Sequence, residues 1–201
     1  KINEKKQLSQ LYKTKVASVL YPGRQNENLT FNIDGKETFL LGGHSNILTM
    51  LCRERGDLAS YLSDEHGFNN PEGLYNKVNT DIVSVGDSFV HGHCVSENQT
   101  MSAHIRQKYP NSINLGIGAN GALLKLATLK EYAEPIRPKI VLWFYTEHTL
   151  GRFLYNYHPI LIKYLDPNFS QGLFHIQSKV DNQLKGLILE STNNESNNSI
   201  L

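Results

Sequence analysis

Long apolar runs are missing from this chain, and their absence limits what it can be. No apolar run in its 201 residues approaches the length of ~20 residues that a helix needs to cross a bilayer. None forms the short apolar core of a signal peptide either. The sequence therefore predicts no membrane span. Because the chain begins at Lys1 rather than Met, we expect that an upstream segment preceded it. Localisation stays open, and an exported or membrane-tethered parent is compatible with this start.

Cysteine is also scarce. The two cysteines, Cys52 and Cys94, are 42 residues apart and show no Cys-x-x-Cys or metal-type spacing, so a zinc site is not expected. They can pair in a disulfide or remain free buried thiols, and we favour the free thiols.

Neither sign of charge dominates. There are 20 Lys and Arg against 19 Asp and Glu, for a formal net charge of +1. No basic run stands out, so nucleic acid is not the expected partner, and small neutral or weakly charged substrates fit better. The 39% hydrophobic content is enough for one substantial core, which predicts a single domain. The sequence does not indicate the oligomeric state.

The first 80 residues are expected to form an extension of hairpin and loops. Apolar positions at helical spacing predict a helix over 7–20. The alternating segments 29–33 and 37–41 flank Asp34-Gly35, a dipeptide typical of a tight hairpin turn. Residues 42–80 are rich in Gly, Asn, Asp and Pro, and are predicted to be loop laid over the sheet.

From Asp81 onward the pattern alternates between strands and helices. Such alternation predicts a parallel, right-handed doubly wound sheet, and the third strand, nearly all apolar, is expected to be central. Further helices are predicted near the end, followed by a polar tail. We expect strands at 81–86, 113–116 and 139–145, helices at 97–109, 121–133, 157–165 and 171–189, and the tail at 191–201.

The first of these strands runs directly into a candidate nucleophile. Ile82, Val83 and Val85 form a short β-branched run that Gly86 ends, which places Ser88 at the carboxyl edge of the strand. In open α/β sheets this edge is where ligands bind. A serine on a tight glycine-bounded turn at that edge is the position expected of an activated nucleophile.

Two segments resemble signature blocks of the SGNH, or GDSL, hydrolase family. Gly86-Asp87-Ser88-Phe89 with Gly92 is similar to the first block, and Ile113-Asn-Leu-Gly-Ile-Gly-Ala-Asn-Gly121 to the second. The resemblance implies a three-layer α/β/α domain with a flavodoxin-like parallel sheet. On this interpretation residues 1–201 are one domain, with an N-terminal extension (1–80), an α/β core (81–190) and a polar tail (191–201), and the domain is expected to be C-terminally incomplete.

The resemblance also implies a serine esterase, possible substrates being small-molecule or carbohydrate esters. Ser88 would attack the ester carbonyl and form an acyl-enzyme. The backbone N–H of Ser88 and one from Gly118 or Ala119 would stabilise the oxyanion, with Ala119 at a position usually held by glycine. No metal or organic cofactor is implied. Asp87 is expected to accept backbone N–H bonds and hold the turn, and His91 to have a capping or packing role.

The family's last two blocks are not matched. His148 stands where the third block has an asparagine, so it is a candidate oxyanion donor or relocated general base. The Asp-x-x-His block that supplies the base does not occur after residue 150. Three alternatives follow: the base lies in a missing C-terminal segment, another histidine replaces it, or the protein binds without turnover.

Two other functions compete with the esterase. An acyltransferase on the same scaffold would use Ser88 but pass the acyl group to a sugar hydroxyl. A non-catalytic carbohydrate-binding or ligand-binding module would keep the cleft and need no base. A dinucleotide site at Gly116, Gly118 and Gly121 is disfavoured, because no acidic residue ends the next strand where a ribose contact is needed.

Overall fold

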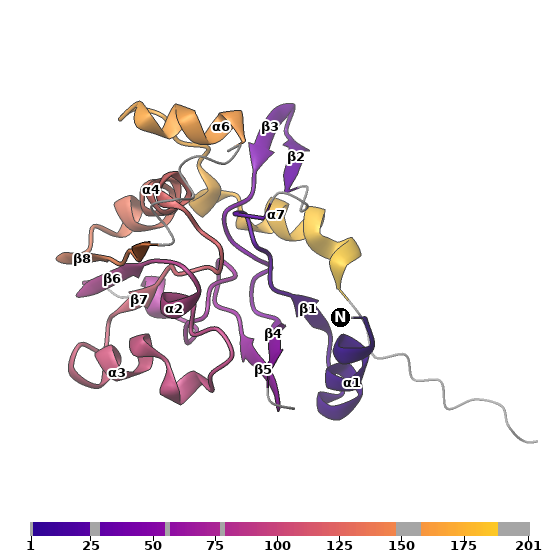
Figure 1. Cartoon of the computed structure of the whole chain (residues 1–201). Coiled ribbons are helices and arrows are strands. Elements are labelled where there is room, and N and C mark those ends of the chain that lie inside the picture. The colour runs from indigo at the N-terminus through magenta and orange to yellow at the C-terminus, as the bar shows by residue number, and fades with distance from the viewer. Residues whose placement is uncertain (1, 25–28, 55–56, 77–78, 148–157, 189–201) are drawn as a thin grey trace, which may run out of the picture.

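Figure 1 shows the computed structural model of the chain, which describes residues 2–24, 29–54, 57–76, 79–147 and 158–188. Within these residues the protein is mixed α/β, with one parallel, one antiparallel and one mixed sheet. The mixed α/β class expected from the sequence is therefore confirmed.

The parallel sheet is the frame for the candidate nucleophile. It consists of β6 (Ile82–Val85), β7 (Ile113–Asn114) and β8 (Ile140–Trp143) in the order β7-β6-β8. All four residues of β6 are buried, as expected for a β-branched run in a parallel sheet. The three predicted strands and their parallel pairing are confirmed, although each is shorter than predicted.

Helices occupy both sides of this sheet in Figure 1. α2 (Ser88–His91) follows β6, and α3 (Met101–Lys108) begins at Thr100, whose hydroxyl accepts a hydrogen bond from Ala103 N at 3.0 Å. Such N-capping satisfies a donor at the helix start. α4 (Ala122–Thr128) continues into a π-helical turn over Leu129–Ala133. These helices confirm the two predicted between the strands.

β8 was expected at the centre of the sheet, and this is wrong for the described part of the chain. It pairs there with β6 alone and forms the sheet edge. Ile140 and Val141 alternate between the two faces, yet they are 49% and 45% exposed. An apolar run is typical of a strand that is covered on both faces of the sheet. It does not show whether a further strand pairs with the free edge, and so it cannot distinguish a central strand from an edge strand.

The N-terminal hairpin is confirmed. β2 (Thr30–Ile33) and β3 (Lys36–Phe39) pair in antiparallel fashion. Asp34 and Gly35 have φ values of 54° and 78°, the left-handed backbone that a two-residue hairpin turn requires.

Two other N-terminal predictions are wrong. Residues 42–80 contain β4 (Leu48–Glu54) and β5 (Asp57–Leu62), an antiparallel pair where loop was expected. The predicted helix over 7–20 is α1 (Ile2–Tyr12), followed by β1 (Val16–Ser18), which pairs with β4. Lys13, with a left-handed φ of 48°, stands just after α1 and is incompatible with continuing it.

The C-terminal part is helical in short pieces. α6 (Pro159–Ile162) and α7 (Gln177–Leu184) are much shorter than the helices predicted over 157–165 and 171–189. Glu131 holds the connection between them, because its carboxylate accepts hydrogen bonds from Tyr164 Oη and from the backbone N–H groups of Gln171 and Leu173 at 2.6–2.7 Å. These tertiary bonds are invisible to helical periodicity.

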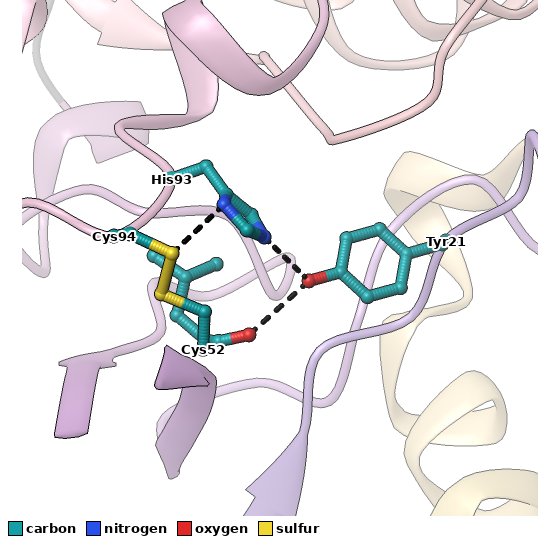
Figure 2. Close-up of a disulfide and its surroundings, with 5 residues drawn as sticks. Tyr21, Cys52, His93 and Cys94 are labelled. Atoms are coloured by element: carbon teal, nitrogen blue, oxygen red, sulfur yellow. Dashed lines mark hydrogen bonds between the residues drawn. A yellow bond between two sulfur atoms is a disulfide. The ribbon is translucent and has the colours of Figure 1, made fainter. Parts of the chain in front are cut away.

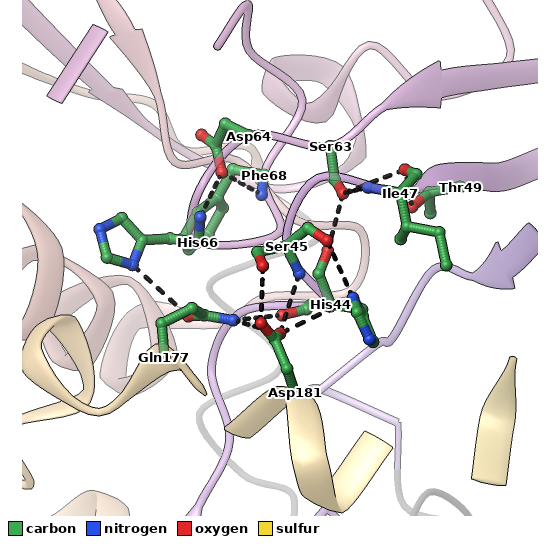
Figure 3. Close-up of polar contacts among 11 residues, drawn as sticks. His44, Ser45, Ile47, Thr49, Ser63, Asp64, His66, Phe68, Gln177 and Asp181 are labelled. Carbon is green, nitrogen blue, oxygen red and sulfur yellow. Dashed lines mark hydrogen bonds and ion pairs between the residues drawn. The ribbon is translucent and has the colours of Figure 1, made fainter. Parts of the chain in front are cut away.

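α7 is fastened to the N-terminal half through Asp181 (Figure 3). Its carboxylate accepts hydrogen bonds from Ser45 N at 3.0 Å and Ser45 Oγ at 2.6 Å. Gln177 Nε2 donates to Gly43 O at 3.0 Å and to Asp181 Oδ1 at 2.9 Å. Segments more than 130 residues apart in sequence thus share one polar cluster.

A second polar cluster joins the N-terminal half to the parallel sheet. Buried Asp64 accepts hydrogen bonds from the N–H groups of His66 and Phe68 and from Asn70 Nδ2, at 2.7–2.9 Å. Asn70 in turn pairs with the backbone of Asn114 on β7, accepting from its N–H at 2.7 Å and donating to its carbonyl at 2.8 Å. The side-chain amide thereby acts as an added strand residue beside β7.

Asp64 should make stability depend on pH. Burial raises its pKa from 3.8 to about 7, since the charged form is desolvated. Between these values the native state holds a proton that the unfolded state has lost, so this contribution to stability falls as pH rises from about 4 to about 7. The limit for one group is about 1.4 kcal/mol per pH unit.

The measurement is urea unfolding of wild type and Asp64→Asn from pH 4 to 8. We expect wild type to gain stability relative to the variant as pH falls through this window. Glu72→Gln, at an exposed glutamate outside this cluster, is the control for removing a carboxylate. A flat difference for Asp64→Asn would contradict the shift.

Candidate functional site

Ser88 lies where the sequence places it, directly after the carboxyl end of β6. It is the first residue of α2, and Asp87 caps that helix by accepting a hydrogen bond from Phe89 N at 3.2 Å. The expected structural role of Asp87 is confirmed. Among the described residues none is hydrogen-bonded to Ser88 Oγ, and the side chain is only partly buried. No hydrogen bond within the described part of the chain therefore holds the hydroxyl.

The second sequence block runs alongside the same strand. Leu115 N donates to Ser84 O at 2.8 Å, and Ile117 N donates to Gly86 O at 3.3 Å, which continues the β6–β7 pairing beyond the strands. A methyl group built on Gly118 would lie 3.8 Å from Ser88 Cβ. The two blocks, about thirty residues apart in sequence, thus meet at the serine.

Asn114 fixes the two blocks against each other. Its Nδ2 donates to Val90 O in α2 at 2.8 Å, while its Oδ1 accepts from Gly116 N at 2.8 Å. Gly116 lies so close to α2 that an added Cβ would be 2.6 Å from His91 N. Only glycine permits this approach of the two backbones.

The two candidate donors of the second block differ in their hydrogen bonds. Gly118 N donates to His91 Nδ1 at 3.2 Å, so this N–H is already engaged. Ala119 has a φ of 69°, a left-handed conformation that favours glycine, and its N–H has no partner among the described residues. The N–H of Ser88 has none there either. Within the described part of the chain, the N–H groups of Ser88 and Ala119 are therefore the two of these three candidates that are not engaged.

His91 is a packed residue, as expected. It is 1% exposed, and its Nε2 is 3.4 Å from Tyr61 Oη. Burial, helped by the nearby His93, lowers its pKa to about 3. The imidazole is accordingly neutral at physiological pH, which lets Nδ1 accept the hydrogen bond from Gly118.

The general base is not found among the described residues. No histidine there is hydrogen-bonded to Ser88 Oγ. His148, the candidate oxyanion donor or relocated general base, lies outside the described residues.

Sequence reasoning missed a cluster beside the nucleophile turn (Figure 2). Cys52 on β4 and Cys94 form a disulfide, so the favoured prediction of free thiols is wrong. His93 Nδ1 is 3.0 Å from Cys94 Sγ, and its Nε2 is 3.3 Å from Tyr21 Oη. His93 N also donates to Ser88 O at 3.0 Å, which ties the cluster to the turn. The sequence did not indicate that Cys52 lies beside His93 and Cys94, because they are about 40 residues apart and the segment that forms β4 was predicted to be loop.

The comparisons with known proteins found no match: no protein-family model, curated protein or solved structure matches the chain. Among the described residues, no helix is both long and apolar enough to cross a membrane.

The close approach at Gly116 gives a test of how the site is built. Gly116→Ala should lower the free energy of unfolding by about 1–3 kcal/mol, because the new methyl group forces α2 away from the second block. Urea unfolding measures this. Gly186→Ala is the matched control, since an added Cβ there meets nothing within 4 Å. Equal stability of the two variants would show that the two backbones are not in contact.

Proposed function

We propose that the protein is a serine acyl hydrolase of the SGNH type, acting on a carboxylic ester. The observation that carries this proposal is that the two sequence blocks meet at Ser88, where Gly118 lies against the serine side chain. Ser88 Oγ, Ser88 N–H and the N–H of the adjoining Ala119 have no hydrogen-bond partner among the described residues. A nucleophile with donors beside it is the minimum that acyl transfer needs.

The chemistry follows from these positions. Ser88 Oγ attacks the ester carbonyl carbon and loses its proton to a general base, which produces a tetrahedral oxyanion. The N–H groups of Ser88 and Ala119 donate to that oxyanion. Collapse of the intermediate expels the alcohol, and water then hydrolyses the acyl-enzyme.

The fold supports the same proposal. In the order β7-β6-β8 the candidate site follows the middle strand, β6, at the carboxyl edge of a parallel sheet. Ligands bind at this edge in open α/β sheets. The finer assignment, a three-layer α/β/α SGNH domain, belongs to the proposal.

The left-handed φ of Ala119 is a further point in its favour. The resemblance to the SGNH blocks implies a glycine at this position, and 69° is a conformation that glycine adopts freely. A donor N–H needs the backbone conformation rather than a particular side chain, so alanine can supply it at some conformational cost.

The edge also offers apolar surface to a substrate. Phe89, next to the serine, is 71% exposed, and Tyr145, just beyond β8, is exposed to the same extent. Aromatic surface of this kind suits the acyl or alcohol group of an ester better than a charged substrate.

The test is labelling with a fluorophosphonate probe, which reacts with activated serines, followed by intact-mass analysis. Wild type should gain the mass of one probe, and Ser88→Ala should gain none. Ser96→Ala, at an exposed serine, is the matched control and should label like wild type.

Absence of labelling in folded wild-type protein would show that no general base in these 201 residues activates Ser88, which contradicts hydrolysis by this chain and favours the binding module. Labelling that persists in Ser88→Ala would assign the reactive group to another residue. Turnover that requires a sugar hydroxyl acceptor would identify the acyltransferase instead of the esterase.

A further inference from the structure

The cluster of Cys52, His93 and Cys94 has the composition of a metal site. A sulfur from each cysteine and a ring nitrogen of the histidine all lie within 4.8 Å of one another. We propose that, when its disulfide is reduced, this cluster binds a thiophilic divalent cation such as Zn²⁺ through two thiolates and one imidazole. This inference is independent of the reaction at Ser88.

The dimensions of the cluster suit such an ion. Zn–S bonds of about 2.3 Å and Zn–N bonds of about 2.0 Å at tetrahedral angles place the two sulfurs about 3.8 Å apart and each sulfur about 3.5 Å from the nitrogen. The His93 Nδ1 to Cys94 Sγ distance is 3.0 Å, within reach of that value after a small expansion. Reduction lets the two sulfurs approach their own required separation of about 3.8 Å, because sulfurs that are no longer bonded move apart to non-bonded contact.

The imidazole is already oriented as a ligand. Tyr21 Oη donates to Leu51 O at 3.2 Å, and in the reduced state its oxygen accepts from His93 Nε2–H, the two atoms being 3.3 Å apart. In this tautomer the lone pair is on Nδ1, the ring nitrogen that faces Cys94 Sγ (Figure 2). The disulfide sulfur has no proton and can only accept from Nδ1–H, so the tautomer that binds a metal belongs to the reduced state. Ligating histidines commonly hold their second ring N–H in this way, which fixes the tautomer.

Charge and access also fit. Two thiolates and a neutral imidazole balance the charge of a divalent cation, which suits a partly buried site. All three residues are partly exposed, so a reductant and an ion can reach them. The three protein ligands leave a fourth position for water or another small ligand.

The chemical balance is simple. A thiol or phosphine reductant supplies two electrons, and with two protons the disulfide becomes two thiols while the reductant is oxidised. Binding of the cation then displaces both thiol protons to solvent. Either the disulfide or the metal links β4 to the turn that carries Ser88, since His93 N donates to Ser88 O.

The experiment uses Co²⁺ alone as a spectroscopic probe. The protein is reduced with a phosphine under inert gas, its two thiols are counted, and Co²⁺ is added. We expect binding of one ion per chain, seen as a near-ultraviolet thiolate-to-cobalt band with visible bands of tetrahedral cobalt, and loss of both on adding Zn²⁺. The oxidised protein should show neither.

Variants distinguish this site from non-specific binding of Co²⁺ by the two cysteine thiols alone. His93→Gln should weaken Co²⁺ binding by more than about 100-fold, and Tyr21→Phe by about 10-fold through loss of the orienting hydrogen bond. His104→Gln, at an exposed histidine of α3, is the control and should bind like wild type. Circular dichroism of each reduced variant checks that the fold is kept.

Three results would overturn the proposal. The first is a fully reduced, folded protein that gives no cobalt spectrum. The second is a His93→Gln variant that binds as tightly as wild type. The third is a disulfide that is reduced only when the protein unfolds, because a site that cannot open in the native state cannot hold an ion.

Discussion

The pairing of the Asn70 side chain with the backbone of Asn114 is the contact on which the rest of the site depends. Asn70 satisfies both the N–H and the C=O of Asn114, and Asp64 holds Asn70 in turn. Asn114 then binds α2 through Val90 O. The positions of the nucleophile turn and of the second block therefore depend on a chain of buried hydrogen bonds. Leaving any of these buried polar groups unpaired would cost free energy of folding.

The N-terminal half has a larger part in the site than its predicted role as an extension indicated. It supplies Asp64 and Asn70 to the parallel sheet, and Cys52 to the turn that carries Ser88. Tyr21 packs against Gly118, since a Cβ on that glycine would be 2.8 Å from the tyrosine ring. The parallel sheet and the N-terminal strands are thus parts of one construction around the serine.

The accuracy of the sequence predictions follows from how local each signal is. The β6 strand, the Asp34-Gly35 turn and the cap by Asp87 depend on neighbouring residues, and all three were predicted correctly. The β4–β5 pair was missed because its polar and turn-forming surroundings resemble loop. The Cys52–Cys94 disulfide and the placement of His93 depend on that missed pair, so no local pattern could have shown them.

The neutral imidazole of His91 has a consequence for the conditions in which the site survives. A pKa of about 3 means that mild acidification, to about pH 5, leaves Nδ1 unprotonated and still bonded to Gly118 N–H. An ordinary surface histidine would already be mostly cationic there and would repel that donor. The hydrogen bond that holds the second block against the serine turn therefore persists at mildly acidic pH.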